Sequence, residues 1–129
     1  MNDRSTTNTR EVLVVEDNRE TQLLLRHLLQ TRFSVTVATD AGSALDEIRD
    51  GHYRLILMDI NLGDEQDGVD IFKKIRKIER YEDVPIIALT AYALPGDKER
   101  FVKTGFDGYL SKPFTREQLL DTVEDVMAA

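Results

Sequence analysis

The sequence predicts a doubly wound α/β domain, in which helices cover both faces of a parallel sheet. Strand-like apolar segments alternate with segments of helical periodicity five times along the 129 residues. A helix between two strands makes a crossover long enough to join them in parallel. The near-continuous apolar runs LVV, LILM and IIAL indicate strands that are buried on both faces.

The predicted strands are short and either continuously apolar or alternate between apolar and polar residues. They cover residues 11–16 (EVLVVE), 33–38 (FSVTVA), 54–59 (RLILMD), 84–90 (VPIIALT) and 108–111 (GYLS). Five such strands with helical crossovers predict a flavodoxin-like (βα)5 sandwich with the strand order 2-1-3-4-5.

The predicted helices place apolar residues on one face at intervals of three or four residues. They cover residues 18–30, 41–50, 69–80, 95–104 and 115–127. The fourth helix has the weakest apolar stripe, which contains Phe101 and Val102. The last helix begins at Thr115, which forms a capping-box pattern with Gln118.

Composition narrows the class of protein. Residues 1–10 contain no large apolar side chain other than Met1, so we expect a flexible tail there and one folded domain over 11–129. The chain has no cysteine, which excludes disulfides and thiolate metal sites. With no signal peptide and no apolar run near the roughly 20 residues that span a bilayer, we expect a cytoplasmic protein. The net charge of −7 argues against non-specific nucleic-acid binding.

Polar side chains follow four of the predicted strands at the point where each strand ends. In a doubly wound sheet, sites form outside the carboxyl ends of the strands, and the order 2-1-3-4-5 places these four strands side by side. We therefore expect one pocket that contains three carboxylates, a hydroxyl and an ammonium group. The residues are Glu16, Asp17, Asp59, Asn61, Thr90 and Lys112.

Three carboxylates in one pocket repel one another unless a cation lies between them. An all-oxygen ligand set favours a hard ion, and a few carboxylates with water suit Mg²⁺, or alternatively Mn²⁺, better than Ca²⁺. A metal, a lysine and a threonine around one carboxylate favour phosphoryl transfer onto it, because they stabilise the phosphoryl oxygens. Asp59 is then the predicted nucleophile. Each residue alone has an ordinary structural interpretation, such as a helix cap or a surface lysine, and only their combination favours this chemistry.

Five motifs follow the predicted strands in a fixed order: VVEDN (14–18), ILMDIN (56–61), DG (67–68), ALTAYA (88–93) and GYLSKPF (108–114). Together they resemble the response-regulator receiver domains of two-component signal transduction, including those related to chemotaxis regulators. The resemblance covers roughly residues 11–127.

The resemblance implies a role for each polar residue at the metal. Asp59 would accept a phosphoryl group from a phosphohistidine of a sensor histidine kinase or a histidine phosphotransfer protein. Asp17 would bind Mg²⁺ directly, Glu16 would bind it through water, and Asn61 would supply its backbone carbonyl.

The resemblance also implies how the signal leaves the site. Thr90 and Lys112 would contact the phosphoryl oxygens, and the Lys112–Pro113 peptide bond would be cis. Tyr109 would turn inward with Thr90 and change the face of the fourth helix, fifth strand and fifth helix. An unknown output protein would bind this face, and the domain would be a monomer or a phosphorylation-dependent dimer.

Two features depart from the family pattern. Gly63 replaces a frequent proline, and Gly68 lies nine positions after Asp59 where eight are usual, so the loop conformation stays open. Tyr92 lies two residues after Thr90, at a position that tunes hydrolysis in the family. The resemblance implies that its bulky side chain, without an acid or amide group, screens the attacking water, so we expect a long-lived phosphorylated state.

Several functions compete with a stand-alone phosphoacceptor switch. A haloacid-dehalogenase-type phosphatase would need its nucleophile after the first strand, whereas Asp59 follows the third. A DNA-binding regulator would need a basic or helix-turn-helix segment, so we expect no direct DNA binding. A receiver excised from a hybrid histidine kinase and a phosphorylation-independent docking module stay open. We expect no enzymatic activity other than the domain's own phosphorylation and dephosphorylation.

Overall fold

The computed structural model describes residues 10–62, 68–91 and 95–128. Its five strands form one parallel sheet in the order β2-β1-β3-β4-β5, as the sequence predicts. The expected tail, apart from Arg10, lies outside the described residues. None of the described helices is long and apolar enough to cross a membrane.

Strands and helices alternate along the whole described chain. The strands are β1 (Glu11–Val15), β2 (Ser34–Ala38), β3 (Leu55–Asp59), β4 (Ile86–Thr90) and β5 (Gly108–Ser111). The helices are α2 (Arg19–Leu29), α3 (Ala41–Asp50), α4 (Gly68–Arg76), the 3₁₀ helix η1 (Glu79–Tyr81), α5 (Asp97–Thr104) and α6 (Arg116–Ala128).

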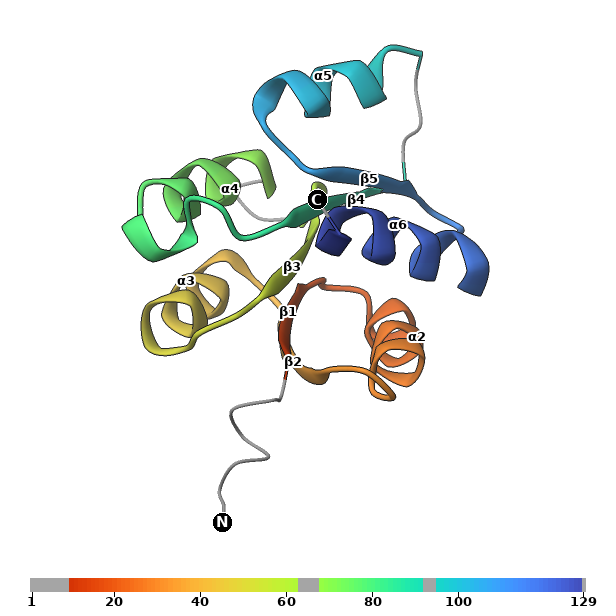
Figure 1. Ribbon diagram of the computed structural model, residues 1–129, viewed down its shortest axis with the longest axis horizontal. Helices are drawn as coiled ribbons and strands as arrows, with labels where there is room; N and C mark the ends of the chain where they lie inside the picture. The colour runs from red at the N-terminus through yellow and green to blue at the C-terminus, as the bar shows by residue number, and fades with distance from the viewer. Residues whose placement is uncertain (1–9, 63–67, 92–94, 129) are drawn as a thin grey trace.

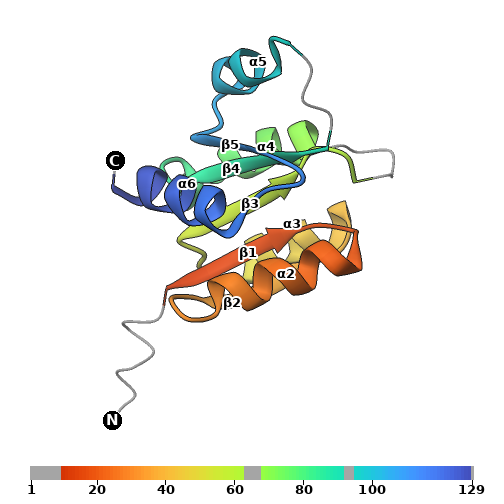
Figure 2. The ribbon, with the colours of Figure 1, turned by 90° about the vertical axis from the view of Figure 1, so that its right-hand side faces the viewer.

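The helices form a layer on each side of the sheet (Figures 1 and 2). Helices α2 and α6 cover one face, where Leu25 and Leu119 pack against Leu57 of β3. Helices α3 and α4 cover the other face, and Phe101 of α5 joins their apolar cluster through Phe106, which stacks on Phe72. The central strands are therefore buried on both faces, which explains their continuous apolar sequences.

Asp59 is a charged residue at the end of a fully buried strand. All five residues of β3 are buried, and Asp59 is only 2% exposed. Each neighbouring leucine or isoleucine that is fully buried contributes roughly 1.5–3 kcal/mol to folding. The burial of the apolar residues of β3 thus offsets the free-energy cost of burying the Asp59 carboxylate.

The predicted capping residues are confirmed at the last helix. The Thr115 N–H donates to Gln118 Oε1 at 2.9 Å, and the Gln118 N–H donates to Thr115 Oγ1 at 3.0 Å. These reciprocal bonds satisfy two backbone donors at the helix end.

The third helix is shorter than the sequence predicts. We expected it over residues 69–80, but α4 ends at Arg76, and Ile78 adopts an extended conformation before η1. The Arg76 guanidinium donates to the carbonyls of Tyr81 and Val84 at 2.8 Å each, which stabilises the chain where it turns back. Tyr81 is 1% exposed, so its burial competes with continuation of the helix.

Gly68 brings the start of α4 against the end of β3. Its N–H donates to the Ile60 carbonyl at 3.0 Å. A Cβ atom at this position would overlap the Asp59 carbonyl oxygen and lie 2.8 Å from the Ile60 Cα. The chain therefore returns to Asp59 despite the additional loop residue, and α4 begins at Gly68, one residue before the expected start. Gly63 and Asp67 lie outside the described residues.

Gly68→Ala is expected to destabilise the domain by about 1–3 kcal/mol, because backbone atoms must move to admit the new methyl group. Gly42→Ala is the matched control, since its Cβ would meet only the Asp40 carboxylate, at 3.7 Å, in an exposed part of α3. The control should change stability by less than about 1 kcal/mol, in the stabilising direction. Urea unfolding of both variants measures the difference, and equal stabilities would contradict the proposed close contact.

Candidate functional site: an acidic cluster at the ends of β1 and β3

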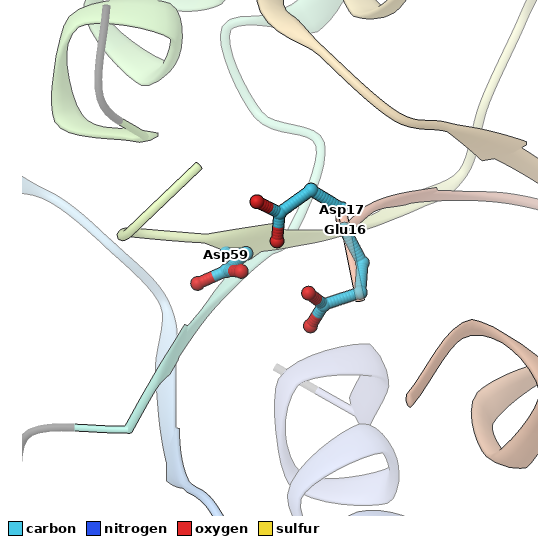
Figure 3. Close-up of side chains that lie close together, drawn as sticks. All are labelled: Glu16, Asp17 and Asp59. Atoms are coloured by element: carbon cyan, nitrogen blue, oxygen red, sulfur yellow. The ribbon is translucent and has the colours of Figure 1, made fainter. Parts of the chain in front are cut away.

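The carboxyl ends of β1 and β3 bring three acids together. The strands pair in parallel with Val15 opposite Met58, so the residues after β1 lie beside the end of β3. Carboxylate oxygens of Glu16, Asp17 and Asp59 lie within 4.8 Å of one another (Figure 3). Glu16 and Asp59 are buried, whereas Asp17 is exposed.

Lys112 supplies the positive charge beside this cluster. Its N–H donates to the Thr90 carbonyl at 2.8 Å, which holds the residue next to the end of β4. Its Nζ lies 2.6 Å from Glu16 Oε1 and 3.3 Å from Asp59 Oδ2. The Glu16 contact is an ion pair without the alignment of a hydrogen bond. The Lys112–Pro113 peptide bond is cis, as expected.

The ammonium group of Lys112 stays protonated in this setting. Burial alone would lower the pKa of Lys112, but its contact with Glu16 and the charge of Asp59 act in the opposite direction and raise it overall. One cation therefore serves two buried carboxylates over the ordinary pH range.

Burial and crowding raise the pKa values of two of the acids. Burial raises the pKa of Glu16, and the adjacent Asp59 raises it further, while Lys112 offsets part of the shift. Desolvation raises the pKa of Asp17 as well, with a contribution from Glu16. Three carboxylates face one ammonium group, so the cluster holds more negative charge than Lys112 neutralises.

Backbone groups orient the buried carboxylates. Glu16 Oε2 accepts a hydrogen bond from the Asn18 N–H at 3.0 Å. Asp59 Oδ1 accepts one from the Asn61 N–H at 2.9 Å. In each case an amide two residues further along the chain fixes the carboxylate that precedes it.

Thr90 completes the group at the end of β4. It is 2% exposed, and its hydroxyl donates to Asn61 Oδ1 at a long 3.5 Å. The structure thus gathers the six polar residues that the sequence predicts to share a pocket. Tyr92 lies outside the described residues.

Tyr109 lies apart from the acidic cluster, on a partly buried position of β5. Its ring stacks on Phe101 of α5 with centroids 5.7 Å apart. Phe101 in turn meets Phe106 edge to face at 5.9 Å. Burial raises the pKa of Tyr109, and the charge of Asp97 adds to this effect.

One contact to the loop between β1 and α2 (residues 16–18, the acidic loop) was not predicted from sequence. Gln22 Nε2 donates to the Glu16 backbone carbonyl at 2.7 Å. Gln22 looks like an ordinary polar residue of a helix, because nothing in its spacing from Glu16 indicates a loop that bends back to it.

The family model of the response regulator receiver domain matches residues 12–124. The chain belongs to this family. It is therefore a receiver of two-component signalling, as its motifs predict.

Two relatives illustrate where such receivers occur. The polar-differentiation response regulator DivK of Brucella ovis is 37% identical over 120 residues, covering 92% of this chain and 97% of DivK. Hybrid signal transduction histidine kinase I of Dictyostelium discoideum is 40% identical over 120 residues, covering 88% of this chain but only 7% of that kinase. The receiver is thus similar both to a short regulator and to one segment of a large kinase.

A solved structure shares the fold at similar identity. The receiver domain of sensor histidine kinase PA1611 from Pseudomonas aeruginosa is 36% identical, with a TM-score of 0.83 over 94% of this chain and 99% of that one. That structure has a magnesium ion coordinated in its active-site cleft.

Lys112→Met should destabilise the receiver by about 2–4 kcal/mol, because it leaves buried carboxylates without their cation. Lys112 lowers the pKa of Glu16, so its removal raises that pKa further above the ordinary 4.5. A folded-state pKa above the unfolded value costs stability as pH rises, so the loss should be larger at about pH 8 than at about pH 5.

The matched control is Lys103→Met, which changes an exposed lysine of α5. Urea unfolding at both pH values compares the two variants. A loss for Lys112→Met that does not depend on pH would contradict the electrostatic explanation.

Proposed function

We propose that this receiver is a phosphoacceptor switch in which Asp59 is the covalent acceptor. The observation that carries this proposal is the position of Asp59, buried at the end of β3 within ion-pair distance of Lys112 and beside two further acids. A carboxylate in this setting is held in one orientation and faces a cationic group that can neutralise charge on an incoming phosphoryl group.

In the proposed reaction, an Asp59 carboxylate oxygen attacks the phosphorus of a phosphohistidine. A new oxygen–phosphorus bond forms, the nitrogen–phosphorus bond breaks, and the imidazole of the donor leaves. The Asn61 N–H holds Asp59 Oδ1 and so orients the nucleophile. Lys112 contacts the oxygens of the transferred group, and the Thr90 hydroxyl donates a hydrogen bond to one of them.

The acidic cluster fits a divalent metal. Ligand oxygens around Mg²⁺ lie up to about 4.2 Å apart, from metal–oxygen distances of roughly 2.1 Å, so a spread of 4.8 Å needs only a small contraction. Asp17, Asp59 and the Asn61 carbonyl are the proposed direct ligands, with Glu16 acting through water, and Mn²⁺ is an alternative ion. When bound, the metal supplies positive charge to the phosphoryl oxygens.

The proposed output begins at Thr90 and Tyr109. Thr90 would move toward the phosphoryl group, and Tyr109 would leave its stacked position on Phe101 for the vacated space. Phe101 is the buried apolar residue of the short helix α5, so this change would alter how α5 packs. An output protein would bind the altered face of α5, β5 and α6.

The donor is proposed to be a sensor histidine kinase or a histidine phosphotransfer protein. An apolar hollow of about 340 Å³ beside Lys112 offers it a surface, lined by Thr21, Leu24, Ala91, Lys112, Pro113 and Phe114. Leu23 and Leu24 are exposed next to it on α2. We propose that this exchange occurs in the cytoplasm, without direct DNA binding and without turnover of any other substrate.

Three aspects of this function have alternatives. The domain could act alone, as the similarity to DivK suggests, or as one module of a hybrid kinase. It could be a monomer or dimerise on phosphorylation. A docking module that works without phosphorylation is the second candidate function, and the exposed apolar surface around Leu24 favours it.

Incubation with acetyl phosphate and Mg²⁺ should add one phosphoryl group to the protein, detected by intact mass. Asp59→Asn should abolish the gain, because the acceptor carboxylate is lost, and removal of Mg²⁺ with EDTA should prevent it. Asp125→Asn, an exposed acid of α6, is the control and should be phosphorylated like the wild type.

A gain that persists in Asp59→Asn would contradict the assignment of the acceptor. No gain in a folded protein that binds Mg²⁺ would require the same test with a phosphorylated kinase. Failure there would favour the docking module.

Mg²⁺ at 100 times its dissociation constant should stabilise the receiver by about 2.7 kcal/mol. Because the pKa values of Glu16 and Asp17 are raised, protons compete with the metal, and affinity should fall as pH falls through this raised range. Calorimetric titration at several pH values measures this dependence. Affinity that increases at lower pH would contradict carboxylate ligation.

A further inference from the structure

We infer that Gln22 is a positioning residue for the metal-binding acids, an inference that rests on the proposed function. Gln22 lies in the second turn of α2, and its Nε2 donates to the Glu16 carbonyl at 2.7 Å. It would act through the backbone of Glu16 and would not contact the metal or the phosphoryl group.

The Glu16 carbonyl lies beyond the last ladder pairs of β1, so it receives no hydrogen bond from a neighbouring strand among the described residues. The last ladder pairs of β1 join Val15 to Ala38 and to Met58. Beyond them, the Glu16 N–H still reaches the Ala38 carbonyl at 3.0 Å. Among the described residues, the Glu16 carbonyl accepts its hydrogen bond from the Gln22 side chain.

The N-cap and the N-terminal end of α2 therefore hold both the carboxylate and the backbone carbonyl of Glu16. Gln22 holds the backbone carbonyl, and the Asn18 N–H holds carboxylate oxygen Oε2 at 3.0 Å. Asn18 is also the N-cap of the helix, through its side chain and the Thr21 N–H at 2.9 Å. The acidic loop is thus tied to the helix end as one unit.

Asp17 depends on this unit for its own position. It is exposed and lies between Glu16 and Asn18, so these two residues hold the backbone from which its carboxylate reaches the cluster with Asp59. A metal that needs near-ideal octahedral geometry is sensitive to such placement. Groups that orient metal ligands typically change affinity by 10–100-fold when they are removed.

Gln22→Met tests this role, because Met keeps the length and helix propensity of the side chain but lacks the N–H donor. The helical bond from the Gln22 backbone N–H to the Asn18 carbonyl, at 3.0 Å, does not involve the side chain. Gln30→Met is the matched control, since it makes the same substitution at an exposed position at the other end of α2.

MgCl₂ titration by calorimetry on the full chain gives the decisive measurement, with urea unfolding in EDTA beside it. We expect Gln22→Met to weaken Mg²⁺ binding about tenfold and Gln30→Met to leave it unchanged. A structural role alone would lower stability in EDTA but leave the Mg²⁺ affinity within about twofold of the wild type, and this result would overturn the inference. Absence of Mg²⁺ binding by the wild type would instead overturn the proposed metal site, and the inference with it.

Discussion

The site depends on the ion pairs of Lys112, whose ammonium group lies between the buried carboxylates of Glu16 and Asp59. Without a cation, two buried negative charges would cost enough free energy that one acid would take up a proton or the two would move apart. Lys112 lies 2.6 Å from Glu16 and 3.3 Å from Asp59, and these distances require the ends of β1, β3 and β5 to stay in register. The hydrogen bonds from Asn18 and Asn61 then fix which carboxylate oxygen faces the lysine.

One lysine leaves the cluster of three carboxylates with excess negative charge, which favours the binding of a cation. The apolar strands provide the necessary support, since β3 and β4 are buried along their whole length. Like charges repel one another, so acids on a flexible loop would move apart, whereas strands of a rigid sheet can hold them close together. The stability of the core therefore maintains the raised pKa values of Glu16 and Asp17.

Helix α5 has a single buried residue. Helix α5 buries Phe101, whose ring contacts Tyr109 on one side and Phe106 on the other. Phe106 stacks on Phe72 of α4 with centroids 4.1 Å apart. The change proposed for Tyr109 would therefore meet a row of aromatic rings that joins β5 to α5 and α4.

The sequence alone determined the fold class, the strand order and the six polar residues of the site. It could do so because burial on both faces leaves apolar runs, and because parallel strands bring their carboxyl ends to one edge. Tertiary structure decided where α4 ends, since the burial of Tyr81 and the contacts of Arg76 compete with helical periodicity. It also decided that Glu16 is the nearer partner of Lys112 and that Gln22 holds the Glu16 backbone. These contacts join separate elements at distances set by loop bends and packing, which local residue spacing does not encode.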